Sequence, residues 1–422
     1  MIKEQEAFVD VKAKEEDLDP DYTFDRVPKS SRKGFISIFF IMLGFTFFSA
    51  SMSVGAKLGN GLNLSGFLWS ILIGGAILAI YTGLLAYISA DTGLSFDLLA
   101  RKSFGVKGSK LPSILIGFTQ IGWFGVGLAM FAVPASEVLG VNKYILIAIA
   151  GILMTSSAYF GIKGMEIISY ISVPLITILG CYSIFLALGD GGSLRDIFAK
   201  NQGSISLTMG IGLVIGSFVS GGTATPNFAR FAKNKKIAVI STVIAFFIGN
   251  SLMFTFGAVG GAFTGKDDIF YVMIAQGLTL VAIIVLGANI WTTNDNALYT
   301  GALGLSNITG ARKKKMVILS GIIGTVAALW LYENFVGWLT FLNGTLPPIG
   351  GILILDYFMN KKKYNEDSRD KNNVNYSAIV AVIVGAVIGN FIKFGIASLN
   401  AIFASCLVYF ILEKNKKNKE RR

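Results

Sequence analysis

The sequence predicts an all-α polytopic membrane protein, and three observations support this fold class. Of the 422 residues, 53% are hydrophobic and only 15% are charged, whereas soluble globular domains have about 25% charged residues. Apolar stretches long enough to cross a bilayer recur from residue 35 to residue 412. The mean hydropathy of the whole chain is +0.64. A soluble protein with an unusually large core is the remote alternative.

The composition also argues against several classes of function. The net charge is +12, but Lys and Arg cluster between the apolar stretches, so we do not expect nucleic-acid binding. The lack of histidine excludes a histidine proton relay. Cys181 and Cys406 lie within apolar stretches, which is typical neither of a metal site nor of a disulfide framework. The sequence shows no nucleophile–base pair, metal cluster or phosphate loop, so we do not expect an enzyme.

A polar tail precedes the apolar stretches. Residues 1–34 include nine acidic residues and do not resemble a cleavable signal peptide, so we expect a disordered cytoplasmic tail. A second tail, 414–422, is basic. Between the tails, the usual length of about 17–25 residues per span predicts twelve helices: 35–56, 64–90, 111–136, 143–161, 165–188, 205–228, 236–262, 274–299, 315–331, 335–358, 375–392 and 396–413.

The basic residues predict the orientation of these spans. If the N-terminus is cytoplasmic, the two tails and the even-numbered connections hold thirty-one Lys and Arg residues, and the opposite side holds six. Cytoplasmic connections carry an excess of Lys and Arg in membrane proteins. We therefore expect a multi-pass protein of the cytoplasmic membrane with both termini in the cytoplasm.

The first and sixth spans contain stretches that are unusual for helices. These are "GFTFFSASMSVG", residues 44–55, and "GSFVSGGTATP", residues 216–226. Gly, Ser, Thr and Pro at this density weaken a helix and free backbone groups. Close packing of neighbouring helices against small residues is the alternative interpretation. We expect both helices to be broken, with Pro226 just beyond the second break.

The two stretches predict an internal repeat. Phe48 and Phe218 are 170 positions apart, and the polar positions Trp123 and Asn289 of the third and eighth spans are 166 apart. Interrupted helices at corresponding places in two halves indicate a transporter binding site. We therefore predict a five-plus-five inverted repeat, with helices 1–5 in 35–188, helices 6–10 in 205–358 and two further helices in 375–413.

The eighth span ends in a polar stretch, "NIWTTNDNALY", residues 289–299. Asn289, Thr292, Thr293 and Asn296 have the spacing of one helical face, which must face protein or water because hydrocarbon penalises such groups. Neighbouring threonine hydroxyls, with carbonyls freed by the broken first span, could hold a small hard cation. Hydrogen bonding between helices is the alternative. Asp295 lies off this face, with a role that is structural or that tunes the site.

The third span contains "TQIGWFGVG", residues 119–127. Gln120 and Trp123 are neighbours at i and i+3. An amide beside an indole could hold a flat polar ligand by stacking and by hydrogen bonds to its edges. A packed tryptophan beside a helix-bridging glutamine is the alternative. The predicted centre contains no Lys or Arg, so a neutral ligand is favoured over an anion.

From about Lys29 to Asn360 the chain resembles the bacterial cytosine permeases of the nucleobase–cation symporter family, which have the leucine-transporter fold. The stretches that carry the resemblance include "RKGFISIFFIMLGFTFFSASM", "LLARKSFGVKGSKLPS", "GFTQIGWFGVGLAMFAVP", "IGNSLMF", "NIWTTNDNALY", "GIIGTVAALWLYENFVGWLTFL" and "PPIGGILILDYFMN". The acidic N-terminal tail and the last two spans match poorly.

The resemblance implies a set of site residues. Trp123 and Phe218 correspond to the aromatic residues that sandwich the base. Gln120 and Asn289 match its amide partners, with Ser217 and Ser220 nearby. A sodium site maps to the carbonyls of Gly44, Phe47 and Asn289 and the hydroxyls of Thr292 and Thr293.

The function expected from these observations is uptake of cytosine coupled to sodium, and we expect the protein to be a monomer in the bilayer. Another heterocycle, such as a purine, uracil, a hydantoin or a thiamine-precursor pyrimidine, is the main alternative, and coupling to protons is a second. A channel is disfavoured because Trp123 and Phe218 would occlude the path.

Overall fold

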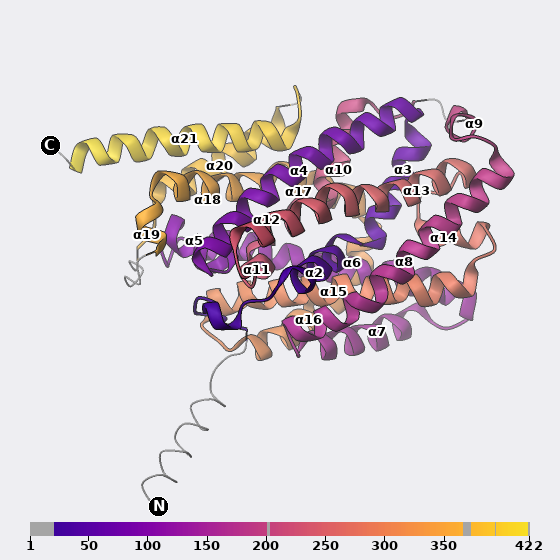
Figure 1. Cartoon of the computed structure of the whole chain (residues 1–422), viewed down its shortest axis with the longest axis horizontal. Coiled ribbons are helices and arrows are strands. Elements are labelled where there is room, and N and C mark those ends of the chain that lie inside the picture. Colours follow the sequence, from indigo (N-terminus) through magenta and orange to yellow (C-terminus); the bar gives the residue numbers. More distant parts are fainter. Residues whose placement is uncertain (1–20, 201–202, 366–372, 393, 421–422) are drawn as a thin grey trace, which may run out of the picture.

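The computed structural model describes residues 21–200, 203–365, 373–392 and 394–420, and its regular elements within these ranges are all helices, which confirms the all-α class. Figure 1 shows their arrangement. In chain order they are η1 (Lys29–Ser31), α2 (Phe35–Thr46), α3 (Ser49–Gly61), α4 (Leu64–Thr92), α5 (Phe96–Phe104), α6 (Lys110–Leu139), α7 (Lys143–Ala158), α8 (Ile162–Gly191), α9 (Leu194–Ala199), α10 (Leu207–Ala224), α11 (Pro226–Ala229), α12 (Lys235–Val243), η2 (Ile244–Gly249), α13 (Asn250–Thr264), α14 (Ile269–Ala275), α15 (Thr279–Thr309), α16 (Lys313–Glu333), α17 (Phe335–Thr345), α18 (Pro347–Met359), α19 (Lys361–Asn365), α20 (Tyr376–Phe391) and α21 (Ala397–Glu420).

Most of the predicted spans reappear as long apolar helices. Within the described ranges, eight helices are long and apolar enough to cross a membrane, and the bent pair α2 and α3 makes a ninth. The remaining three predicted spans coincide with other helices. Two of these, α7 and α20, are apolar but have only 16 residues each. The third, α15, has 31 residues and carries the polar stretch.

The first span is broken where the sequence predicts it. Helix α2 ends at Thr46, Phe48 is extended, and α3 starts at Ser49 after a bend of 51°. The carbonyl of Phe47, which lies at this break, accepts a hydrogen bond of 2.5 Å from the side-chain amide of Asn289 in α15. A broken helix persists inside a membrane protein only where another group satisfies the exposed backbone. Here Asn289 of the eighth predicted span provides the hydrogen bond for the exposed Phe47 carbonyl of the first.

The sixth span departs from the prediction. Helix α10 is continuous through Gly216–Ala224, and the interruption falls only at Thr225, before Pro226. The small residues instead allow neighbours to approach closely. A Cβ on Gly221 would lie 2.8 Å from the Phe45 ring, and one on Gly222 would lie 2.9 Å from Thr82. The close-packing interpretation therefore holds for 216–224, because these buried residues keep their helical hydrogen bonds.

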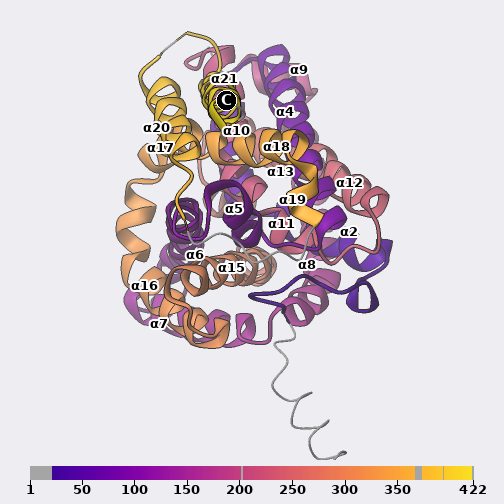
Figure 2. The same ribbon diagram turned by 90° about the vertical axis from the view of Figure 1, so that its left-hand side faces the viewer.

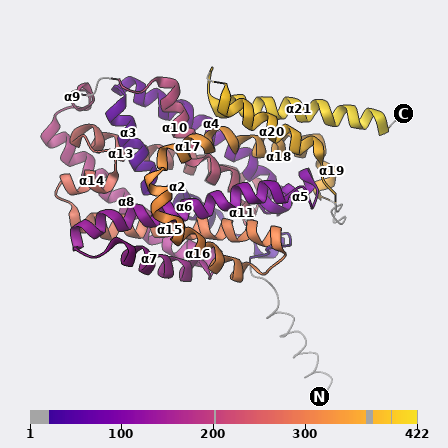
Figure 3. The same ribbon diagram turned by 180° about the vertical axis from the view of Figure 1, so that it is seen from behind.

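The helices form a layered bundle around α6 and α15. Helices α20 and α21 lie along one side of the molecule, against α18, and α7 and α16 lie along the opposite side (Figures 1 and 3). Figure 2 shows α6 and α15 close together between these groups. Gly117 of α6 and Gly304 of α15 allow this approach, since a Cβ on Gly304 would be 3.1 Å from Gly117. The core is thus built around the two helices that carry most of the predicted polar site.

An N-terminal strap, here residues 21–33, packs against the helix ends. Asp21, Thr23 and Val27 are buried. The backbone N–H of Val27 donates to Gly93 at 2.9 Å, and that of Lys33 donates to Phe231 at 2.6 Å. The expectation of disorder is therefore wrong for 21–33, because apolar and hydrogen-bonding residues hold this segment against the helix ends; residues 1–20 lie outside the described ranges.

Glycine at position 93 makes one of the strap's contacts possible. Helix α4 ends at Gly93, whose φ of +73° favours glycine. A Cβ there would also be 3.0 Å from the Val27 carbonyl and 2.8 Å from the Arg32 guanidinium.

At the other end of the chain, the predicted basic tail continues α21, which is helical to Glu420.

Candidate substrate and ion site

A small buried cavity lies where the broken span meets α6, α10 and α15. Its volume is about 20 Å³, room for about one water molecule. The cavity brings together five of the predicted substrate residues from two helices distant in sequence. Its lining comprises Phe45, Phe48, Gln120, Trp123, Ser217, Phe218, Ser220, Gly221, Thr293, Asn294 and Ala297.

Ser220 joins the two polar side chains of α6. The indole N–H of Trp123 donates to the Ser220 hydroxyl at 2.8 Å, and the Gln120 amide donates to the same oxygen at 3.2 Å. All three side chains are buried. The sharing of one hydroxyl orients both donors toward α10. A ligand with acceptor and donor edges could exchange hydrogen bonds with this group.

Four aromatic rings line the cavity. Trp123 meets Phe48 edge-on, with ring centroids 5.8 Å apart, and Phe218 meets Phe45 edge-on at 5.3 Å. These contacts hold the two predicted stacking residues in place from their edges. Phe45 and Phe48 were not among the predicted site residues, although both lie in the stretch predicted to be broken. Their spacing on either side of the break was the signal that could have identified them.

Two predicted substrate residues have partners of their own in this structure. The Ser217 hydroxyl donates to the Val214 carbonyl at 2.9 Å. The Asn289 amide donates to Phe47 and accepts from the Ser49 hydroxyl at 2.8 Å. Asn289 is not among the cavity's lining residues. It lies instead at the break between α2 and α3, beside the predicted ion site.

Four of the five predicted ion ligands converge at the same break, and Thr292 is the exception. The Thr293 hydroxyl oxygen lies 3.4 Å from the Gly44 carbonyl and 3.5 Å from each of the carbonyls of Phe47 and Asn289. Such a cluster of oxygens is the chemistry that hard cations prefer. Thr293 also lines the cavity, so one side chain borders both sites.

Thr292 lies on the side of α15 that faces α8. Its hydroxyl lies 2.7 Å from that of Ser172 and 3.1 Å from the Ala288 carbonyl. A Cβ on Gly44 would lie 2.1 Å from the Ser169 hydroxyl, so α2 and α8 are close here. Ser169 and Ser172 add oxygens that the sequence analysis missed. Their i, i+3 spacing in the fifth predicted span was the available signal.

Asp295 and Asn296 of α15 are not among the residues that line the cavity. The Asp295 carboxylate accepts a hydrogen bond of 2.7 Å from Ser157 of α7, whose oxygen also accepts one from the Trp291 indole at 2.6 Å. The Asn296 amide donates to the Thr292 carbonyl. Asp295 therefore lies between α15 and α7, which favours the structural role considered from the sequence.

Comparison with known proteins places the chain among transporters. A family model described as permease for cytosine/purines, uracil, thiamine, allantoin matches residues 26–412. The cytosine permease of Escherichia coli K12 is 51% identical over 396 residues, which cover 93% of this chain and 94% of the relative. The hydantoin permease of Microbacterium maritypicum is 25% identical over 64% of this chain and 62% of its own length.

Two solved structures share the fold. Mhp1, a nucleobase-cation-symport-1 family transporter in a closed conformation with bromovinylhydantoin bound, has a TM-score of 0.79 and 19% identity, covering 93% of this chain and 94% of that one. A substrate-bound, outward-open Na⁺-coupled sialic acid symporter has a TM-score of 0.68 and 15% identity, with 90% of each chain covered.

Proposed function

Because the chain belongs to the family of permeases for cytosine, purines, uracil, thiamine and allantoin, we propose that it imports cytosine by sodium-coupled symport with alternating access. It is a membrane permease and not an enzyme, as its family and relatives are permeases. The observation that carries the proposal is the adjacency of two sites. The aromatic and amide cavity and the oxygen cluster at the break share Thr293.

The proposal includes the topology predicted from the sequence. Twelve helices cross the cytoplasmic membrane, with α7, α15 and α20 spanning in addition to the long apolar helices, and both termini are cytoplasmic. Helices 1–5 in 35–188 and helices 6–10 in 205–358 form the inverted repeat, and 375–413 holds the last two. The similarity to Mhp1 over 93% of the chain supports this arrangement.

Cytosine would bind between Trp123 and Phe218, with the polar edge of the ring toward Gln120 and Ser220. The cavity of about 20 Å³ is smaller than a nucleobase, so binding would require its walls to move apart, with Ser217 and Asn289 then completing the polar contacts. Stacking suits a flat heterocycle, and the amide and hydroxyl groups can both donate and accept. The 51% identity to a cytosine permease supports cytosine over the other substrates of the family.

Sodium would bind among the carbonyls of Gly44, Phe47 and Asn289 and the hydroxyls of Thr292 and Thr293. Asn289 is central to coupling, because its carbonyl belongs to this cluster and its amide holds Phe47 and Ser49. An ion that orders the break between α2 and α3 would therefore also order Phe48, which lines the cavity. Coupling of this kind is reciprocal.

Loss of either stacking residue should weaken substrate binding. We expect Trp123→Ala and Phe218→Ala each to reduce the affinity for cytosine by about 1–3 kcal/mol, through loss of stacking. Trp291→Phe is the control, since Trp291 contacts Ser157 on the α7 side. Binding measured by calorimetry on the purified variants tests this. Wild-type affinity in both alanine variants would exclude the stacked arrangement.

The site should prefer cytosine to uracil. Gln120 and Asn289 can accept from the 4-amino group and donate to the ring carbonyl and nitrogen. Uracil carries a donor at N3 and an acceptor at position 4, so buried groups would lose partners at about 1–3 kcal/mol each. Competition against labelled cytosine measures the difference. Gln120→Met should reduce it, and equal competition by the two bases in the wild type would contradict the assignment.

Thr292 and Thr293 should contribute to sodium binding and affect cytosine binding only through the ion. We expect Thr293→Val and Thr292→Ala each to raise the sodium concentration needed for half-maximal cytosine binding. The increase should be on the order of tenfold, because each variant loses one contact to a charged group. Cytosine affinity should recover as sodium is raised. Thr300→Val is the control, because Thr300 lies further along α15 and accepts from Asn227 at 3.5 Å. Cytosine binding by the wild type that is independent of sodium would contradict sodium coupling and leave a proton as the better candidate.

Uptake of radiolabelled cytosine into proteoliposomes tests the whole proposal. Accumulation above the external concentration, dependent on an inward sodium gradient, is expected for a symporter. Equilibration without accumulation under every gradient would instead indicate a passive path. Competition by hydantoins, purines or uracil stronger than by unlabelled cytosine would identify a different substrate of the family.

A further inference from the structure

A groove runs along the outer surface between α7 and α16. These helices lie side by side at the edge of the molecule in all three views (Figures 1, 2 and 3). Small residues form its floor: a Cβ on Gly151 would lie 2.4 Å from the Thr325 hydroxyl, and one on Gly321 would lie 2.2 Å from that of Thr155. Larger apolar residues line it, and among them Val326 is 83% exposed.

The groove has the chemistry and length of an acyl-chain site. Only 33% of the apolar part of α16 is buried within the protein, so this helix presents most of its surface to the hydrocarbon. From Ala148 to Tyr159 the groove follows α7 for about 16 Å at the rise of a helix. One leaflet is about half of a hydrocarbon core of about 30 Å. The groove therefore matches the depth of one leaflet.

One end of the groove is basic. The Lys314 ammonium lies 5.1 Å from the centroid of the Tyr159 ring, and Tyr159 lines the groove. Lys314 and Lys315 precede Ile318 and Ile322 on the same face of α16, and Lys163 follows Tyr159 closely in the chain. All three lysines are exposed, and within the described ranges none forms a salt bridge. This end is also the one that the charge distribution places in the cytoplasm.

We propose that the groove binds an anionic phospholipid of the cytoplasmic leaflet, with one acyl chain along Gly151 and Gly321 and the phosphate beside Lys314 and Lys315. Charge complementarity selects this occupant, because a neutral lipid would fill the groove but leave the lysines without a counter-charge. The lipid would brace α16 against α6, where a Cβ on Gly125 would lie only 2.6 Å from the Gly324 carbonyl. The proposal does not depend on the identity of the transported substrate.

Native mass spectrometry of the full-length protein tests the proposal. The protein is titrated with phosphatidylglycerol or with phosphatidylcholine of the same acyl chains. We expect the first phosphatidylglycerol to bind on the order of tenfold more tightly than phosphatidylcholine. Lys314→Gln should reduce its affinity about fivefold, the factor for one basic residue at a membrane surface. Equal binding of the two lipids by the wild type would overturn the proposal.

Two further variants separate the headgroup from the chain. Lys143→Gln is the matched control, because the Lys143 ammonium lies 5.7 Å from the Tyr144 ring at the other end of α7, outside the groove. It should leave phosphatidylglycerol binding unchanged, and a loss equal to that in Lys314→Gln would refute a specific site. Ser156→Phe fills the groove from an exposed position. It should weaken the first binding event for both lipids, and unchanged binding would show that the groove is not the site.

Discussion

Replacement of Lys313 by methionine should lower the free energy of unfolding by about 3–5 kcal/mol, the cost of removing one partner of a buried ion pair. Lys313 forms a salt bridge with Asp21 of the N-terminal strap, and the two side chains are only 3% and 5% exposed. The Lys313 ammonium also lies 5.0 Å from the centre of the Tyr299 ring. Without this ammonium, the Asp21 carboxylate would stay buried beside fewer positive charges.

The effect should extend to the attachment of the strap. Arg230, which is fully buried, donates to the carbonyls of Asp21 at 2.7 Å and Tyr22 at 3.0 Å. The strap thus joins the end of α11, through Arg230, to the start of α16, through Lys313. Its release would leave the Arg230 guanidinium without two of its acceptors, which is a cost beyond the loss of the ion pair.

Thermal unfolding in detergent measures the change, with Lys314→Met as the control. Lys314 is the exposed neighbour, so its replacement should change stability by less than about 0.5 kcal/mol. Asp21→Asn combined with Lys313→Met should restore part of the loss, because it removes the buried negative charge. If the Lys313 and Lys314 variants melt alike, the buried pair does not stabilise the fold.

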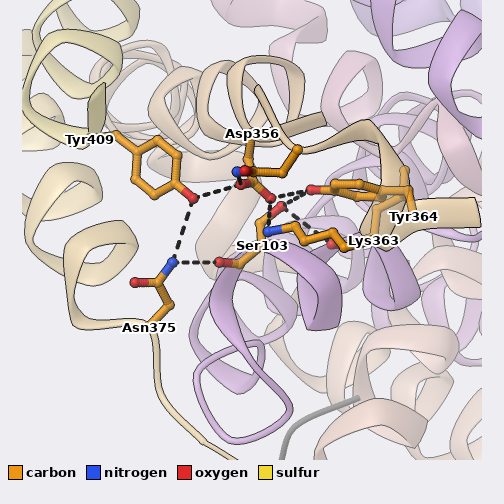
Figure 4. A network of polar contacts seen from close by, with 8 residues as sticks. Ser103, Asp356, Lys363, Tyr364, Asn375 and Tyr409 are labelled. Atoms are coloured by element: carbon orange, nitrogen blue, oxygen red, sulfur yellow. Dashed lines mark hydrogen bonds and ion pairs between the residues drawn. The ribbon is translucent and has the colours of Figure 1, made fainter. Parts of the chain in front are cut away.

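Asp356→Ala should be destabilising to a similar extent, about 3–5 kcal/mol. Figure 4 shows the network around this carboxylate, which is fully buried at the end of α18. It accepts hydrogen bonds from Tyr364 of α19 and from Tyr409 of α21, the latter at 2.8 Å, and pairs with Lys363 at 2.6 Å. Burial, together with the charge of Asp356, holds the pKa of Tyr364 well above its usual value. Tyr364 is therefore a neutral phenol that can donate.

The network extends from Asp356 to two further helices. The Tyr364 and Ser103 hydroxyls lie 2.6 Å apart, which brings in α5, and Asn375, just before α20, donates to the Ser103 carbonyl at 2.9 Å. Removal of the carboxylate would leave several donors without their shared acceptor. The last two helices should then be held less tightly against the bundle.

Thermal unfolding and hydrogen exchange together test this prediction. Exchange should accelerate first in α21 and α20 of Asp356→Ala, before it does in α6 or α15. Lys363→Met is the internal control and should cost less than Asp356→Ala, because Lys363 is 36% exposed and the hydroxyls of Tyr364 and Tyr409 would still donate to Asp356. Uniform destabilisation of the whole chain would show that the network does not specifically anchor these two helices.

The sequence by itself was sufficient for the all-α class, the break in the first span and the spans that meet at the centre. Composition and apolar length report directly on the surrounding hydrocarbon, because each span must satisfy its own backbone. The spacing of Gln120 and Trp123, and of Asn289 and Thr293, places each pair on one helical face. Because this depends only on local helical geometry, it can be predicted from the sequence. The roles assigned to these residues remain predictions for the binding experiments.

Only the tertiary structure decided how these local patterns are used. The small residues of α10 could either break this helix or let other helices pack closely against it. The outcome depends on Phe45 and Thr82, which come from distant helices. The partner of Asp295 is Ser157 of α7, and the partner of Asp21 is Lys313, 292 positions away. Such contacts arise from the packing of whole helices. A single chain's periodicity specifies which face of a helix is polar, but not which neighbour that face meets.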